Sequence, residues 1–124
     1  MTPLGRKLRE LRAARGVTMK DMARELGVSA AYLSAMEHGR RGAPSWYLLQ
    51  KMIRFFNFIW DEAEELERLA LLSDPRVVID TGGLAPEATE LANLLAARIG
   101  ALDVEQLRAL GAIIAPLEKR RRGG

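Results

Sequence analysis

Two short amphipathic helix patterns joined by one glycine turn, within residues 16–45, constrain the fold of this chain more than any other feature. Thr18 opens the first pattern as a helix cap, and Gly27 ends it. Ser29 caps the second pattern, which ends near Gly39. Because alanine allows close approach and glycine tolerates a left-handed turn, we expect two closely packed helices with the second pushed outward as a rod. The residues spaced to pack this pair together are Ala23, Leu26, Val28 and Leu33.

Helix signals also flank this pair. The β-branched run RVVID at residues 76–80 leaves open a short strand, an extended link or a buried connector. Because the strand signal is confined to that run, the expected fold class is all-α. The other segments with helical spacing of apolar residues run from Thr2 to Arg15, Ser45 to Phe56, Asp61 to Ser73, Pro86 to Ile99 and Asp103 to Leu117.

The order of these segments predicts four parts. Four to five helices form an N-terminal domain, a linker that includes RVVID follows, a C-terminal helical hairpin comes next, and a basic tail ends the chain in a disordered state. The expected boundaries of these parts are 1–72, 73–85, 86–118 and 119–124.

Charge is strongly segregated along the 124 residues. Residues 1–57 carry 11 Lys/Arg against 4 Asp/Glu, and residues 58–118 carry 4 against 12, whereas the tail KRRR at residues 119–122 is wholly basic. The net charge of +3 conceals this contrast. A basic half joined to an acidic half indicates a polyanion-binding module attached to a part with another role.

Composition disfavours several classes of protein. The absence of cysteine argues against a disulfide-stapled secreted fold and against thiolate ligands or nucleophiles, and the single histidine, His38, cannot form a histidine metal site alone. The charged N-terminus lacks a signal-peptide pattern, and no window approaches the roughly 20 apolar residues of a membrane span. We therefore expect a cytoplasmic protein that is not an enzyme and uses no cofactor or metal. His38 is assigned to a loop or phosphate-contact role.

The motifs resemble those of a known family. In chain order, the segments LGRKLRELRAARG, MARELGVS, AYLSAMEHGRR and APSWYLLQKM are similar to the pieces of the Cro/C1-type (xenobiotic-response-element) helix-turn-helix domain of bacterial and phage regulators. The resemblance covers residues 3–58, a little under half of the chain. It implies a lambda-repressor-like domain whose second motif helix enters the major groove of double-stranded DNA.

The resemblance also implies roles for individual residues. Ser29 caps the recognition helix, where its hydroxyl and nearby amides can meet a phosphate. Glu37 matches a family glutamate that is expected to be structural and to hold the loop through a neighbouring arginine. The residues expected to face bases are Ser29, Ala30, Ala31, Tyr32, Ser34 and Ala35, and those expected to contact phosphate are Arg6, Lys7, Lys20, Arg40 and Arg41.

The sequence departs from the family pattern in two places. Met19 stands where the family often has glutamine, so the usual polar anchor is missing. The segment SAAYLSAM contains no Arg, Asn or Gln for a bidentate base contact. Specificity would then rest on alanine contacts with thymine methyl groups, on the hydroxyls of Tyr32 and Ser34, and on DNA shape, with Arg40 or Arg41 as a sensor of minor-groove width.

The two C-terminal helices carry apolar side chains at helical spacing, with a heptad-like pattern in the second helix. They would either cap the N-terminal core or join two copies of the chain. Because one small DNA-binding module has too little interface for tight binding, we expect a homodimer. The expected interface residues are Leu91, Leu94, Leu95, Ile99, Leu107, Leu110, Ile114 and Leu117.

Two further groups of side chains have a structural and a functional interpretation. The acidic run at residues 61–67 is expected to be a solvated helix face, with a surface for RNA polymerase as the alternative. Because these carboxylates lie on one exposed helix, glycosidase-like chemistry is excluded. The aromatic group expected to pack in the core, with a ligand pocket or partner surface as the alternative, is Trp46, Phe55, Phe56, Phe58 and Trp60.

Together these features predict a homodimeric transcription regulator, a repressor that binds an inverted repeat through the major groove. Two alternatives stay open. One is an antitoxin whose C-terminal half grips a toxin while its N-terminal half autoregulates the pair. The other is an adaptor or antiactivator that binds protein on a degenerate helix-turn-helix.

Overall fold

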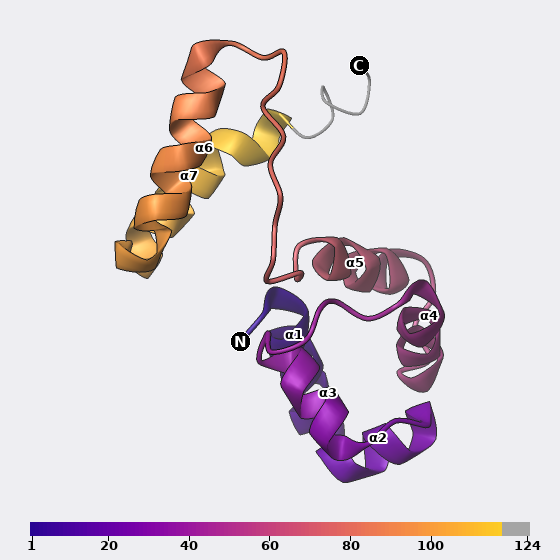
Figure 1. Cartoon of the computed structure of the whole chain (residues 1–124). Helices are drawn as coiled ribbons and strands as arrows, with labels where there is room; N and C mark the ends of the chain where they lie inside the picture. Colours follow the sequence, from indigo (N-terminus) through magenta and orange to yellow (C-terminus); the bar gives the residue numbers. More distant parts are fainter. Residues whose placement is uncertain (118–124) are drawn as a thin grey trace. The chain divides into compact units, whose positions relative to one another are not determined.

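The computed structural model describes residues 1–117 and divides the chain into two compact units. The first unit is Met1–Val77, and the second begins at Val78. Helices make up both units (Figure 1), and no strand occurs within the described residues. The fold is therefore all-α, as the sequence predicts. The predicted basic tail at residues 119–124 lies outside the described residues.

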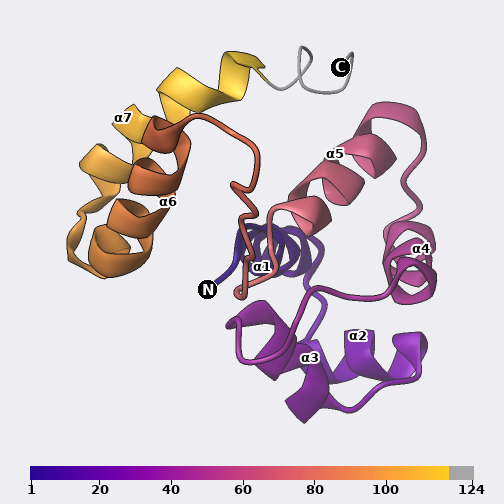
Figure 2. The same ribbon diagram turned by 45° about the horizontal axis from the view of Figure 1, so that its top comes forward.

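Five helices form the first unit around one core. In Figure 2, α1 is seen nearly end-on between α5 and α3. α1 packs against α3 and α5, α2 packs against α3 and α4, and α4 packs against α5. The closely packed pair predicted from the glycine turn is the α2–α3 pair. The helix bounds are α1 (Pro3–Arg15), α2 (Met19–Leu26), α3 (Ala30–Glu37), α4 (Trp46–Phe55) and α5 (Trp60–Leu71).

Local sequence explains where these helices begin and end. A hydroxyl accepts a hydrogen bond from the backbone N–H three residues on at the start of four helices, and the capping residues are Thr2, Thr18, Ser29 and Ser45. Gly27 has a φ of 75° directly after α2, a left-handed conformation that a side chain would strain. The turn and the Ser29 cap together set where α3 starts.

The core is built from the inward faces of all five helices. Its side chains are apolar and almost completely shielded from solvent, as expected for an amphipathic helix that buries one face. The core residues are Leu4, Leu8, Met22, Ala23, Leu26, Leu33, Met36, Leu48, Leu49, Met52, Ile53, Phe56, Leu66 and Ala70.

A buried ion pair joins α1 to α3. The guanidinium of Arg12 donates from Nη2 to Glu37 Oε1 at 3.0 Å and from Nη1 to Glu37 Oε2, and both residues are buried. Nη1 also lies 3.7 Å from Met22 Sδ. Glu37 is therefore structural, but the expectation that it holds the loop through a neighbouring arginine is wrong. Its side chain points inward, and its partner comes from α1.

The same two helices approach closely at Gly5. A Cβ at this position would collide with the backbone of Glu37. The backbone N–H of Thr2 also donates to the Glu37 carbonyl at 2.9 Å. The start of α1 is thus locked against the end of α3, and only glycine leaves room for this packing.

The aromatic group divides between core and surface. Phe56 is buried, and its ring centroid lies 5.0 Å from that of Phe55 and 5.5 Å from that of Phe58. Trp46 and Trp60 are instead 65% and 81% exposed, so the expectation that both pack in the core is wrong. Each is the first residue of its helix, and neither belongs to the core cluster or to the side chains packed against it.

The second unit is a helical hairpin. It contains α6 (Pro86–Arg98), the 3₁₀ turn η1 (Ile99–Ala101), α7 (Val104–Ile114) and the 3₁₀ turn η2 (Ala115–Leu117). Both views show α7 running back alongside α6 (Figures 1 and 2). A reciprocal capping box between Asp103 and Gln106 starts α7, with hydrogen bonds of 2.8 and 3.0 Å.

Residues 76–80 form no strand. The segment runs as an exposed link, and no strand partner for it exists within residues 1–117. Of the three alternatives open for RVVID, the extended link is the one observed in the described part of the chain.

The hairpin has no core of its own. None of residues 78–117 is buried. Two short helices gain little stability from backbone hydrogen bonds alone, so an apolar face of this kind needs a partner surface. From residue 84 to residue 117, the exposed large apolar residues are Leu84, Leu91, Leu94, Ile99, Val104, Leu107, Leu110, Ile113, Ile114 and Leu117.

Within residues 1–117, no helix has both the length and the apolar character needed to cross a bilayer.

Replacement of Gly5 by alanine should destabilise the first unit. The added methyl group has no space against the Glu37 backbone, and overpacking of this kind costs about 1–3 kcal/mol. Gly42→Ala is the matched control, because nothing lies within 4 Å of its Cβ position. Chemical denaturation followed by circular dichroism measures the free energy of unfolding of both variants. Equal stability of the two variants would contradict the close packing of α1 and α3.

Removal of the Glu37 carboxylate should lower the stability of the first unit more than the Gly5 replacement does. Glu37→Ala leaves the Arg12 guanidinium buried and unpaired, which costs about 3–5 kcal/mol in free energy of unfolding. The control is Glu65→Ala, which breaks the exposed pair with Arg68 and should have little effect, since exposed pairs contribute little. Urea denaturation of both variants compares them directly. A Glu37 variant as stable as the Glu65 variant would show that the buried pair does not hold the helices together.

Candidate nucleic-acid interface

The recognition helix α3 buries one side and presents the other. Its inward residues Leu33, Met36 and Glu37 are buried. Of the six residues predicted to face bases, Ser29 and Ala31 are exposed, and the other four are half-buried. Ala30 and Tyr32 pack partly against the core. The predicted base-facing residues therefore lie on a short helix whose opposite face is held by the core.

The loop after α3 is anchored to that helix. The backbone N–H of Arg40 donates to Ala35 O at 2.9 Å, and His38 Nδ1 lies 2.9 Å from Ser34 O. Gly39 has a φ of 76°, which turns the chain directly after α3. Both loop arginines are exposed. Their positive charge is thus carried on an ordered turn beside the recognition helix.

Arg41 returns from this loop to the beginning of α3. Its guanidinium carbon lies 5.4 Å from the centroid of the Tyr32 ring, within the range of a cation–π contact. Tyr32 is the third residue of α3, and its backbone N–H donates to the Ser29 cap at 3.0 Å. Tyr32, which the sequence assigns to base contact, and Arg41, which it assigns to phosphate contact, therefore lie against each other.

Sequence reasoning missed a cleft beside the start of α3. It has a volume of about 440 Å³ and lies between the glycine turn, α3 and α4. The N-terminal ends of both helices, each capped by a serine, line this cleft, and unpaired backbone N–H groups at helix N-termini favour anions. The lining residues are Leu26, Gly27, Val28, Ser29, Tyr32, Ser45, Tyr47, Leu48 and Lys51.

Lys51 supplies positive charge to this cleft. Its Nζ donates to Leu26 O at 3.3 Å and lies 4.7 Å from the centroid of the Tyr47 ring. The spacing of four between Tyr47 and Lys51 places both on one face of α4. That spacing was the signal available in the sequence. With its ammonium group held between two elements, Lys51 joins the loop arginines as a candidate phosphate contact.

The remaining predicted phosphate contacts are spread over α1 and α2. Arg6 and Lys20 are exposed, and Lys20 lies in the first turn of α2. Lys7 is half-buried and close enough to α5 to lower the pKa of the Glu65 carboxyl, after the larger effect of the hydrogen bonds from Arg68. Lys7 thus faces the acidic helix. Met19 packs partly against the core, which explains an apolar side chain where a polar anchor is usual.

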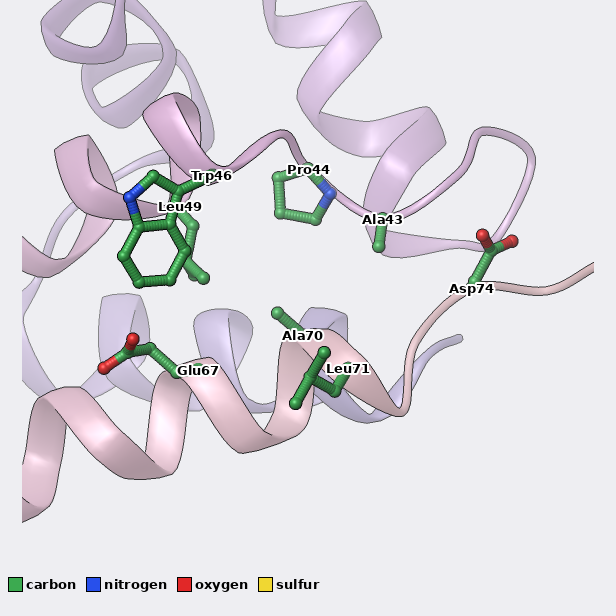
Figure 3. Close-up of a pocket in the computed structure, with 8 residues that line it drawn as sticks. All are labelled: Ala43, Pro44, Trp46, Leu49, Glu67, Ala70, Leu71 and Asp74. Atoms are coloured by element: carbon green, nitrogen blue, oxygen red, sulfur yellow. The ribbon is translucent and has the colours of Figure 1, made fainter. Parts of the chain in front are cut away.

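A second pocket lies between α4 and α5, away from the turn of the α2–α3 pair. It has a volume of about 400 Å³ and is mostly apolar. Figure 3 shows Trp46 and Pro44 on one side and Glu67 and Leu71 on the other, with Asp74 at one end. The two carboxylates stand apart on this surface, so the pocket suits an apolar protein segment better than acid–base chemistry.

Comparison with known proteins agrees with this geometry. Over 52 residues the chain is 42% identical to an uncharacterized HTH-type transcriptional regulator, RghRB, of Bacillus subtilis (strain 168). That match covers 42% of this chain and 37% of the length of the relative. No solved structure matches the chain. A protein family described as a helix-turn-helix domain matches residues 3–69, which is more than half of the chain. The chain therefore belongs to the helix-turn-helix domain family.

Proposed function

We propose that this chain is a sequence-specific DNA-binding transcription regulator. The observation that carries the proposal is α3, a short capped helix held from behind by the buried Arg12–Glu37 pair and flanked by an ordered basic loop. A rod of this width fits the major groove of B-form DNA. The basic first half of the chain supplies the attraction to phosphate that such binding requires.

Within this proposal the residues divide into two roles. Ser29, Ala31 and Ser34, with the half-buried members of the same face, meet base edges. Arg40, Lys20 and Lys51 meet phosphate, joined by amides at the starts of α3 and α4. Arg6 belongs to the same set, and Lys7 contributes less because it faces α5. The Cro/C1 type of helix-turn-helix is the subtype that the motif order favours.

The second unit is proposed to join two copies of the chain. Its apolar side chains are exposed because the hairpin alone gives them no core. Burial of the exposed half of ten such side chains would contribute a free energy of association on the order of 10 kcal/mol, before the entropic cost of association is subtracted. Two hairpins packed against each other form a four-helix bundle, a stable arrangement for this pattern. The predicted interface includes the half-buried Leu95 together with the exposed residues of both helices.

A twofold dimer would read an inverted repeat. The two recognition helices would then enter major grooves about 34 Å apart. Occupation of such a site at a promoter blocks polymerase without any further contact, so repression is the simplest outcome. Activation through the acidic face of α5 would need a separate partner surface for RNA polymerase.

Protein binding is the second candidate function. The apolar pocket bounded by Trp46 and Leu71 favours it, as do the exposed apolar residues of the hairpin. In an antitoxin the hairpin would hold a toxin, and in an adaptor the pocket would hold a peptide segment. The antitoxin would still autoregulate the pair through its N-terminal half, whereas the adaptor would bind its partner without reading DNA.

Selection of bound sequences from a random DNA pool tests the main proposal. The purified chain should recover an inverted repeat, and the Arg40→Ala/Arg41→Ala double variant should bind it more weakly. Loss of a phosphate contact should also reduce the slope of log affinity against log salt concentration by about 1.

Arg54→Ala is the control for this selection. Arg54 is equally basic and exposed but lies at the opposite end of α4 from the Ser45 cap. Its replacement should leave the recovered repeat and the salt dependence unchanged. Failure of the wild-type chain to bind any DNA at low salt would overturn the proposed function and favour a protein-binding role.

The dimer can be tested by placing charge in the hairpin. Leu107→Glu/Leu110→Glu should convert the chain to a monomer in sedimentation experiments, because carboxylates cannot be buried in an apolar bundle. Arg108→Glu makes the same change in net charge on the same helix at an exposed position outside the predicted interface, and should leave the dimer intact. A monomeric wild-type chain, or a dimer that survives the double substitution, would contradict this interface.

A further inference from the structure

The recognition helix lacks a side chain that can read guanine. Its outward positions hold alanine, serine and Tyr32, and each of these side chains has at most one hydroxyl. Guanine presents two acceptors, O6 and N7, in the major groove, and a pair of parallel donors reads them best. A chain that selects DNA sequence through this face must obtain such donors from elsewhere or do without guanine recognition.

Arg41 is placed to supply them. It comes from the loop, yet its guanidinium lies against Tyr32, in the first turn of α3. The first turn of a recognition helix is the part that meets base edges in helix-turn-helix complexes. Within residues 1–117, no carboxylate pairs with Arg41, so its charge is not neutralised by the protein.

The cation–π contact with the Tyr32 ring is not a hydrogen bond to an oxygen or nitrogen acceptor, so it leaves the guanidinium donors of Arg41 available to a ligand. Holding the side chain in advance also lowers the entropy lost when it binds. Arg40 lies next in sequence, and within the described residues it has no such contact with an aromatic ring.

We propose that Arg41, positioned by Tyr32, reads a guanine of the operator. Two N–H groups of Arg41 donate to O6 and N7 of that base in the major groove, opposite the first turn of α3. This assignment rests on the proposed DNA-binding function and replaces the phosphate role that the sequence implies for Arg41. Tyr32 acts as a positioning residue through its ring, not through its hydroxyl.

Selection from random DNA with conservative variants tests the assignment. Arg41→Lys keeps the charge but loses the planar fork, so it should recover the same repeat with a weaker preference for one symmetry-related guanine. The wild-type preference for that guanine should be roughly 10- to 100-fold. Arg54→Lys, in the exposed last turn of α4 and outside the proposed interface, should leave every base preference unchanged. Tyr32→Phe should behave as wild type, whereas Tyr32→Leu should lose most of the guanine preference.

Replacement of that guanine by 7-deazaguanine separates base reading from a structural effect. The analogue lacks the N7 acceptor, so it should weaken binding by the wild-type chain more than binding by Arg41→Lys. Thermal melts followed by circular dichroism check that all variants are folded.

The outcomes separate this inference from the proposed function. An unchanged guanine preference in Arg41→Lys would make Arg41 a phosphate contact and overturn the assignment. A wild-type motif without any guanine preference would also overturn it while leaving DNA binding intact. Absence of all DNA binding at low salt would instead remove the proposed function itself.

Discussion

The ion pair between Arg12 and Glu37 is the interaction on which the first unit depends. A buried charge is tolerated only when it is paired, so the two side chains fix α1 against α3 at one distance. The absence of a side chain at Gly5 permits that distance, and the Thr2–Glu37 backbone hydrogen bond closes the same contact. The outward face of α3 is therefore presented by a rigid frame, a requirement for any helix that must fit a groove.

The two units of the chain differ in how they are stabilised. The first has a continuous apolar core, and the second exposes the residues that should form one. If a twin hairpin covers those residues, folding of the second unit and association of two chains become one event. DNA affinity would then depend on protein concentration, because only the dimer brings two recognition helices to neighbouring half-sites.

Local patterns in the sequence predicted much of this fold, but they did not predict which residues pair across the tertiary structure. The hydroxyl caps at Thr18 and Ser29 could be predicted because each hydroxyl bonds a backbone N–H only three residues away. The partner of Glu37 could not be predicted, since Arg12 lies 25 residues away in sequence and any other nearby arginine would fit the pattern equally well. Trp46 and Trp60 look like core residues by type, but their side chains are exposed, because residue type alone does not decide which face of a helix is buried. For the candidate site, the α3 residues and loop arginines were predicted, whereas Lys51 and the Tyr32–Arg41 contact required the packed structure.

Titration of the ¹⁵N-labelled full chain with a duplex carrying the selected repeat, followed by NMR, tests the central claim most directly. The largest changes in amide chemical shift are expected at residues 29–35, at Arg40 and Arg41, and at the start of α4, with little change in the amide shifts of α5. Shifts confined to α5 and the pocket beside Trp46, or no shifts at low salt, would contradict the assignment of α3 as a DNA-reading helix.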